Sequence, residues 1–161
     1  MPFERKTDPD TILLTGEDNS RDRIDGVAQA ALTPGELVKV TGVSDTGVDD
    51  SRDLVVQDGE AVPVPFRVAI EYSHTGRGID DDYSVDEHAE YRHIKAGERA
   101  YCFLADTETV DYDDLLVSDG NGHFRAAAGD GSEDAAAIAV AAEDVDNETG
   151  GAPARIRVEA L

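Results

Sequence analysis

The chain has few cationic side chains. Among its 161 residues 14 are lysine or arginine, against 36 aspartates and glutamates, which gives a formal net charge of −22. Only three are lysines, namely Lys6, Lys39 and Lys95. Nucleic-acid binding depends on lysine and arginine neutralising phosphates, and anionic membranes attract the same side chains. The composition therefore argues against nucleic acid and membrane as direct partners.

Cysteine is almost absent as well. The single Cys102 excludes an intrachain disulfide and a cysteine-based metal site. It lies in the apolar run from Arg99 to Leu104, where we expect it to fill a core position as a small hydrophobic residue. The chain also lacks an N-terminal apolar segment and any run of membrane-spanning length. These absences predict a soluble protein that is made in the cytoplasm.

Sequence motifs for catalysis are missing too. No G-x-S-x-G is present, and Cys102 has no glycine elbow to expose it as a nucleophile. The segment Thr75-Gly76-Arg77-Gly78 is too short for a G-x-G-x-x-G loop and has no P-loop lysine. The sequence thus predicts no enzyme activity and no cofactor.

What the chain does have is 40% hydrophobic residues in short, regular runs. High net charge with low hydrophobicity is typical of disorder, but these runs predict a folded protein. At 1 M salt the Debye length falls to about 3 Å, which screens the repulsion between acidic groups. The composition is therefore typical of a protein adapted to very high salt.

The chain contains a two-copy repeat, in residues 34–71 and 96–130. The matched positions keep their order and consist of turn and strand residues. They are Gly35-Glu36 with Gly97-Glu98, the run Asp53–Gly59 with Asp114–Gly120, and Phe66-Arg67 with Phe124-Arg125. Solenoids need at least three stacked copies, so this pattern indicates a duplicated β unit instead.

Period-2 alternation and turn signals at short spacing predict an all-β fold, a small barrel or sandwich. We expect an extended arm over 1–25, then one β domain over 26–161 with an insertion at 72–92 and C-terminal strands within 135–161. Asp58-Gly59 and Asp119–Gly122 read as hairpin turns, and residues 43–52 and 106–113 as acidic loops.

Two assignments fit residues 135–142. Ser132 followed by acidic residues and alanines could cap and propagate a helix. The alternation of Ile138 and Val140, and its similarity to residues 27–31, favours a strand.

Histidines and acids gather around the insertion. His88 and His93 are five residues apart, a spacing that puts them on opposite faces of a strand. Glu90 and other acids nearby could complete an oxygen-rich site for a divalent cation. A chain with 36 acids produces such clusters by chance, so the sequence predicts no metal site. The side chains that could contribute to one are Asp80, Asp82, Asp86, His88 and His93.

The ordered features from Gly26 onward carry a family resemblance. They include Gly26-Val-Ala28, the run Pro34-Gly-Glu-Leu-Val-Lys-Val40, Ala96-Gly-Glu98, and a closing line from Ile138-Ala-Val-Ala-Ala-Glu-Asp-Val-Asp146 to Ala152-Pro-Ala-Arg-Ile-Arg-Val158. This pattern resembles the capsid decoration, or cement, proteins of tailed viruses. With the acidic composition, the resemblance implies a virus of a haloarchaeal host.

The resemblance implies a homotrimer on the outer surface of the virion, bound to the major capsid protein of an HK97-type shell and bridging neighbouring capsomers. Candidate contact residues are Ile12, Leu13, Leu14, Pro63, Pro65 and Tyr83, each of which also fits a place in the core or in a solvated loop. The alternative is a small cytoplasmic β-barrel binding protein or enzyme of a halophile, with an acidic and histidine-lined pocket in residues 72–93.

Overall fold

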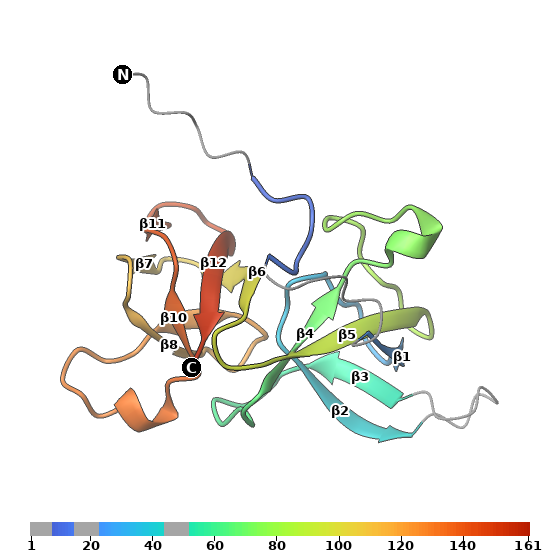
Figure 1. Ribbon diagram of the computed structural model, residues 1–161, viewed down its shortest axis with the longest axis horizontal. Coiled ribbons are helices and arrows are strands. Elements are labelled where there is room, and N and C mark those ends of the chain that lie inside the picture. Colours follow the sequence, from blue (N-terminus) through green and yellow to red (C-terminus); the bar gives the residue numbers. More distant parts are fainter. Residues whose placement is uncertain (1–7, 15–22, 44–51) are drawn as a thin grey trace.

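The computed structural model describes residues 8–14, 23–43 and 52–161, and its fold is all-β, as predicted (Figure 1). One sheet, in the order β2-β3-β1-β5-β4, consists of β1 (Ile24–Ala28), β2 (Val38–Val43), β3 (Arg52–Val56), β4 (Phe66–Ile70) and β5 (His88–Ile94). A closed barrel lies beside it, in the order β10-β12-β6-β9-β8. It consists of β6 (Arg99–Leu104), β8 (Leu115–Ser118), β9 (Phe124–Ala126), β10 (Ala139–Ala141) and β12 (Ala154–Ala160).

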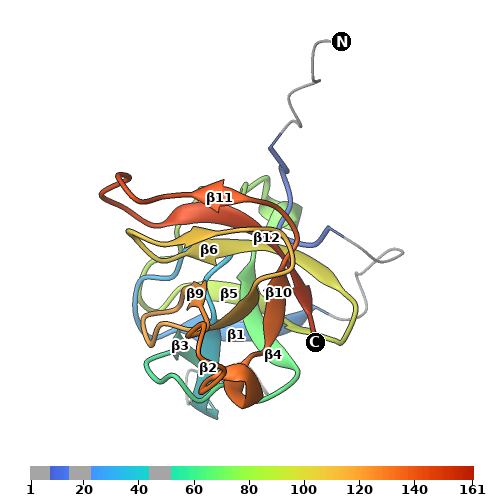
Figure 2. The same cartoon turned by 90° about the vertical axis from the view of Figure 1, so that its left-hand side faces the viewer.

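The remaining elements are small. Strands β7 (Thr109–Val110) and β11 (Val145–Asp146) pair with each other, and β11 lies next to β12 at the upper side of the view in Figure 2. Two single 3₁₀ turns, η2 (Ser73–Thr75) and η3 (Asp134–Ala136), lie in connections. In the described ranges no helix is long and apolar enough to cross a membrane.

Strand β12 illustrates how the sequence sets the fold. Its residues alternate between Ile156, Val158 and Ala160, which are buried, and charged side chains on the opposite face. Because successive side chains of a strand point to opposite faces, this alternation fixes which face meets the barrel interior. A C-terminal strand within the predicted range 135–161 is thereby confirmed.

The first sheet curls until its outer strands meet. Gly35 N donates to Ala69 O at 2.8 Å and Ala69 N to Glu36 O at 3.0 Å, next to an isolated bridge between Leu37 and Val68. These bonds connect the start of β2 to β4. The sheet therefore folds around a core of its own, formed by Ala28, Leu32, Val38, Leu54, Ala69, Tyr83, Ala89 and Tyr91.

A larger core is shared by the sheet and the barrel. Phe66 of β4 and Phe124 of β9 are both fully buried and meet edge to face, with ring centroids 5.5 Å apart. These two phenylalanines occupy matched positions of the sequence repeat. The same core includes Ile70 and Ile94 from the sheet and Leu104 and Ile156 from the barrel. The two parts are therefore packed as one unit.

The two copies of the repeat form strands at matching places but pair them differently. In the second copy β8 and β9 form the predicted hairpin, closed by Asp119 N donating to His123 O at 3.0 Å. In the first copy β3 does not pair with β4; it lies between β2 and β1. The prediction of a hairpin at Asp58-Gly59 is therefore wrong, because other strands take both edges of β3.

The described part of the N-terminal segment is not a free arm. Ile12 is fully buried in the shared core, Tyr101 N donates to Ile12 O at 2.7 Å, and Leu14 N donates to Arg99 O at 3.1 Å. Strand β9 pairs with β6 only at Leu104, so residues 12–14 fill the edge of β6 that β9 does not reach. The boundary at residue 25 also shifts, since β1 begins at Ile24. Predictions for residues 1–7 and 15–22 lie outside the described residues.

The insertion predicted at 72–92 is also corrected, because its last residues belong to β5. This strand pairs with both β1 and β4, so it is central to the first sheet and not part of a loop. For residues 135–142, the strand assignment is confirmed over Ala139–Ala141, which form β10. The turn η3 precedes this strand. The acidic loop predicted at 106–113 contains β7, whereas most of the loop at 43–52 lies outside the described residues.

Ile12→Ala tests whether the N-terminal segment is part of the core. Removing a fully buried isoleucine side chain should lower the free energy of unfolding by about 2–5 kcal/mol, measured by urea denaturation in concentrated KCl. Leu14→Ala is the matched control. Because Leu14 is only half-buried, this change should lower the free energy of unfolding clearly less than Ile12→Ala does. A loss below about 0.5 kcal/mol for Ile12→Ala would contradict this packing.

Candidate functional site

The two histidines of β5 point to different surroundings. His93 Nε2 accepts a hydrogen bond from Arg67 Nε at 2.9 Å. Burial, and then the positive charges of Arg67 and Arg52, lower the pKa of His93. Its Nε2 is therefore engaged by a guanidinium, and His93 does not belong to the metal-compatible group found in the described ranges.

The acidic candidates of the loop before β5 do not converge. Asp80 pairs with Arg155 at 3.2 Å and is almost fully exposed. Asp82 and Asp86 are exposed, and the backbone oxygen of Asp82 and the backbone nitrogen of Asp86 make hydrogen bonds to Arg77 and Ala28. The five candidate ligands Asp80, Asp82, Asp86, His88 and His93 therefore do not come together, and among them His88 belongs to a cluster found in the described ranges.

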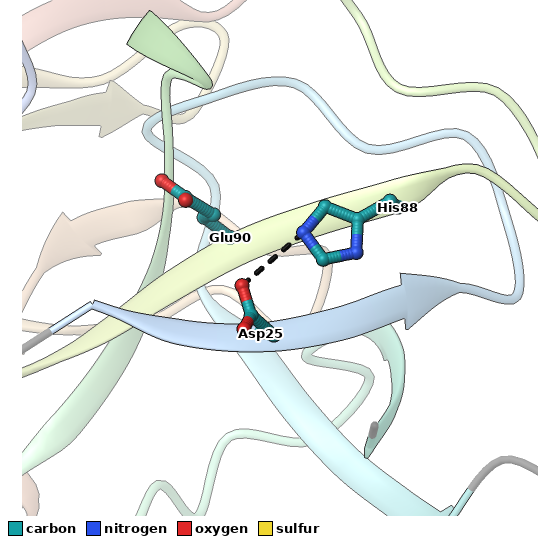
Figure 3. Close-up of side chains that lie close together, drawn as sticks. All are labelled: Asp25, His88 and Glu90. Carbon is teal, nitrogen blue, oxygen red and sulfur yellow. Dashed lines mark ion pairs between the residues drawn. The ribbon is translucent and has the colours of Figure 1, made fainter. Parts of the chain in front are cut away.

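That cluster consists of Asp25, His88 and Glu90, whose potential ligand atoms all lie within 4.8 Å of one another (Figure 3). His88 Nε2 is 3.2 Å from Asp25 Oδ1. Asp25 is exposed, His88 is half-buried and Glu90 is buried. It is the metal-compatible group found in the described part of the chain.

Sequence analysis placed Glu90 near the histidines but assigned Asp25 to the arm. Asp25 and Glu90 stand directly opposite each other in the antiparallel pair of β1 and β5. The sequence alone does not give the register between strands that are distant along the chain, and this register is what brings Asp25 to Glu90.

A buried ion network lies beside this cluster. Arg23 Nη1 donates to Glu90 Oε2 at 2.6 Å and to the backbone oxygen of Glu71 at 2.9 Å, and Arg23 Nη2 lies 3.6 Å from Glu71 Oε1. Glu71 Oε2 in turn accepts a hydrogen bond from Ile12 N at 3.1 Å. Two buried carboxylates are thus balanced by one arginine, and the network ties the N-terminal segment to β4 and β5.

A second ionic contact joins the barrel to the first sheet. His123 follows the hairpin turn of β8 and β9, with Nδ1 3.2 Å from Asp119 and Nε2 3.8 Å from Glu36 of the first sheet. Burial alone lowers the pKa of His123, but the two carboxylates outweigh it and raise the pKa to about 9. At neutral pH the imidazole is therefore charged and bridges the two parts.

The turn that carries His123 fits closely against the sheet. Gly122 O accepts a hydrogen bond from Leu37 N at 2.8 Å. Gly122 has φ +86°, and a Cβ there would lie 2.5 Å from a methyl group of Val56. Only glycine meets both conditions, since φ is positive and no space is left for a side chain.

Arg155 makes a third junction. Its Nη1 donates to Pro34 O at 2.6 Å and its Nη2 to Ile79 O at 2.6 Å, while its guanidinium lies 4.0 Å from the Phe103 ring centroid. Arginine forms such stacked, multiply hydrogen-bonded contacts better than lysine because its guanidinium is planar. This side chain of β12 therefore fixes two loops of the first sheet against the barrel.

Cys102 has the predicted core position. It is fully buried, and desolvation raises the pKa of its thiol to about 12. Since the thiolate is the reactive form, this cysteine is inert.

The candidate contact residues divide by burial. Ile12 and Tyr83 are buried, and Tyr83 Oη donates to Ile70 O at 2.7 Å. Both are therefore corrected from surface contacts to core residues. Leu13 and Leu14 are half-buried, whereas Pro63 and Pro65 are exposed in the connection before β4, beside Val64 with 62% of its surface accessible.

This connection forms one wall of a shallow, mainly apolar groove on the surface. The opposite wall is the turn η3 and the residue that leads into β10. The lining residues are Glu60, Ala61, Val62, Pro63, Val64, Ala135, Ala136 and Ile138.

No protein-family model and no curated protein matches this sequence. Among solved structures, the fold is similar to the crystal structure of the head fiber gp8.5 N base in bacteriophage phi29. The TM-score is 0.53, and the match covers 86% of this chain and 92% of that one. At 8% sequence identity the likeness concerns the fold alone.

His123→Gln tests the contact between barrel and sheet by its pH dependence. Because the pKa is raised above its unfolded value of about 6.5, the stabilisation is complete below that pH and is lost as pH rises through about 9. The free energy of unfolding of the wild type should be larger than that of the variant at pH 6. This difference should fall by on the order of 3 kcal/mol between pH 6 and pH 10. Chemical denaturation at several pH values measures it, and a difference independent of pH would contradict the ionic bridge.

Proposed function

We propose that this chain is a structural protein of a virus particle, bound to the outside of the capsid shell. The observation that carries the proposal is the fold, which is similar over most of the chain to the base of a phage head fiber. The resemblance of the sequence to capsid decoration proteins supports the same role independently of the fold.

The finer parts of the proposal follow from that resemblance. The chain forms a homotrimer, binds the major capsid protein of an HK97-type shell and bridges neighbouring capsomers. Its net charge of −22 supports a tailed virus whose haloarchaeal host lives at molar salt.

A non-enzymatic role agrees with the chemistry of the described residues. The one thiol is buried and inert, and His93 and His123 bond to side chains that hold the fold together. A protein that bridges capsomers needs a rigid body and a complementary surface rather than a reactive group.

The exposed residues 63–65 are the docking element that we propose. Val64 presents an unusually exposed side chain between two prolines, and the apolar groove adjoins it. Prolines fix the backbone in advance, so binding through this segment orders little additional chain.

One observation favours the alternative function, a small halophilic binding protein or enzyme. The cluster of Asp25, His88 and Glu90 overlaps the region where that hypothesis places an acidic and histidine-lined pocket. The two functions differ in a simple way, since only the first requires the chain in mature particles.

Purified virions provide the test of the capsid role. Quantitative mass spectrometry should find this chain at a fixed copy number relative to the major capsid protein, and mild dissociation should release it at about three times 17.2 kDa. An internal virion protein with a known copy number calibrates the ratio. Absence from purified particles would refute the capsid role, and release as a single chain would refute the trimer.

Adaptation to salt predicts a strong dependence of stability on KCl. The midpoint of thermal unfolding should rise by roughly 10 °C or more between 0.2 M and 3 M KCl. At this chain length, each 1 kcal/mol gained in the free energy of unfolding raises the midpoint by about 2–4 °C. Scanning calorimetry measures the shift, and a β-barrel protein of similar size with net charge near zero is the control. An equal shift in both proteins would show that charge screening is not the cause.

A further inference from the structure

The side chains of Asp25, His88 and Glu90 lie on one face of the β1–β5 pair (Figure 3). Asp25 is directly opposite Glu90, and His88 is opposite Val27. Residues two apart in a strand share a face, so β5 contributes His88 and Glu90 side by side. Two strands that are far apart in the sequence thus present three potential ligands, one imidazole and two carboxylates, at one place.

The spacing fits a small divalent ion. Bonds from Zn²⁺ to histidine nitrogen and carboxylate oxygen are about 2.0–2.2 Å, so two ligands of a tetrahedral site lie about 3.3–3.5 Å apart. Asp25 Oδ1 and His88 Nε2 are 3.2 Å apart, which leaves little adjustment to make. A carboxylate oxygen of Glu90 lies within 4.8 Å of both of these ligand atoms.

The local environment holds the ligands in place. Glu90 Oε2 accepts a hydrogen bond from Arg23 Nη1 at 2.6 Å. The ring of Tyr72 packs against His88, with centroids 5.1 Å apart. One ligand is therefore fixed by an arginine and another by an aromatic ring, while the exposed Asp25 leaves the site open to water.

The charge balance also suits a divalent cation. Arg23 contributes one positive charge to a group that holds three carboxylates, those of Asp25, Glu71 and Glu90. The sum of one positive and three negative charges is −2, which a divalent ion would neutralise. Since a buried carboxylate without full compensation is costly, such an ion would stabilise the folded chain.

We infer that Asp25, His88 and Glu90 bind one divalent transition-metal ion of the Zn²⁺ type, with water completing its coordination. One imidazole and two carboxylates suit this class of ion, whereas Mg²⁺ and Ca²⁺ prefer six or more oxygen ligands. The ion would connect β1 to β5 next to the network that holds the N-terminal segment. This inference is independent of the capsid role.

Calorimetric titration of the full chain with ZnCl₂ in 1 M KCl tests the site, since that salt concentration weakens diffuse attraction to the acidic surface. We expect one saturable site per chain and a rise in the thermal midpoint on saturation. Asp25→Asn and His88→Gln should each weaken binding by about 100-fold or more, above the 10–100-fold loss that outer-shell partners cause. Both variants should also lose the rise in thermal midpoint.

Two controls separate this site from nonspecific binding. His74→Gln removes an exposed histidine near Tyr72, and Asp80→Asn removes an exposed carboxylate; both should bind Zn²⁺ as the wild type does. Asp25 is exposed, so Asp25→Asn keeps the fold, which its circular dichroism without metal verifies. Weak multisite binding in the wild type, or a single site unchanged in both ligand variants, would overturn the inference.

Discussion

The contact between Phe66 and Phe124 lies in the core that both parts of the molecule share, and the other junctions depend on it. Aromatic pairs bury a large area and favour an edge-to-face geometry, so they fix relative orientation as well as distance. Once β4 and β9 are held in this way, Gly122 can approach Leu37 and Arg155 can reach Pro34. The polar contacts then select one arrangement among those that the apolar core allows.

Three arginines of the described residues show how the few cations are used. Arg23 balances two buried carboxylates, Arg155 links the barrel to two loops of the sheet, and Arg125 pairs with Glu133 at 2.5 Å. Buried charges without partners are costly, so in a chain this acidic each such position constrains the fold strongly. The excess of acids that remains faces water, where salt can screen it.

The sequence was most informative where the signal is local. Alternation located β12, and the turn chemistry of Asp119–Gly122 located the hairpin of β8 and β9. Asp58-Gly59 carries a turn signal of the same kind, yet β3 pairs with β1 and β2 because strand partners are decided by packing over long distances. A turn motif therefore predicts a change of direction more safely than it predicts a pair of strands.

The same limit applies to the candidate site. The group of Asp25, His88 and Glu90 depends on the register of two strands. Arg23, which holds Glu90 in place, is 67 positions away from it in the sequence. Composition indicated acids near the histidines but gave no way to choose among 36 of them. Ile12 was misjudged for a related reason, since an apolar island in a polar segment fits a free arm as well as a core residue.

The distribution of charge also limits how this molecule could bind a partner. Ion pairs on an exposed surface contribute little to binding, and molar salt weakens them further. Apolar burial does not weaken in this way, because excluded salts strengthen it. Docking at high salt should therefore centre on exposed apolar residues such as Val64 rather than on the charged loops.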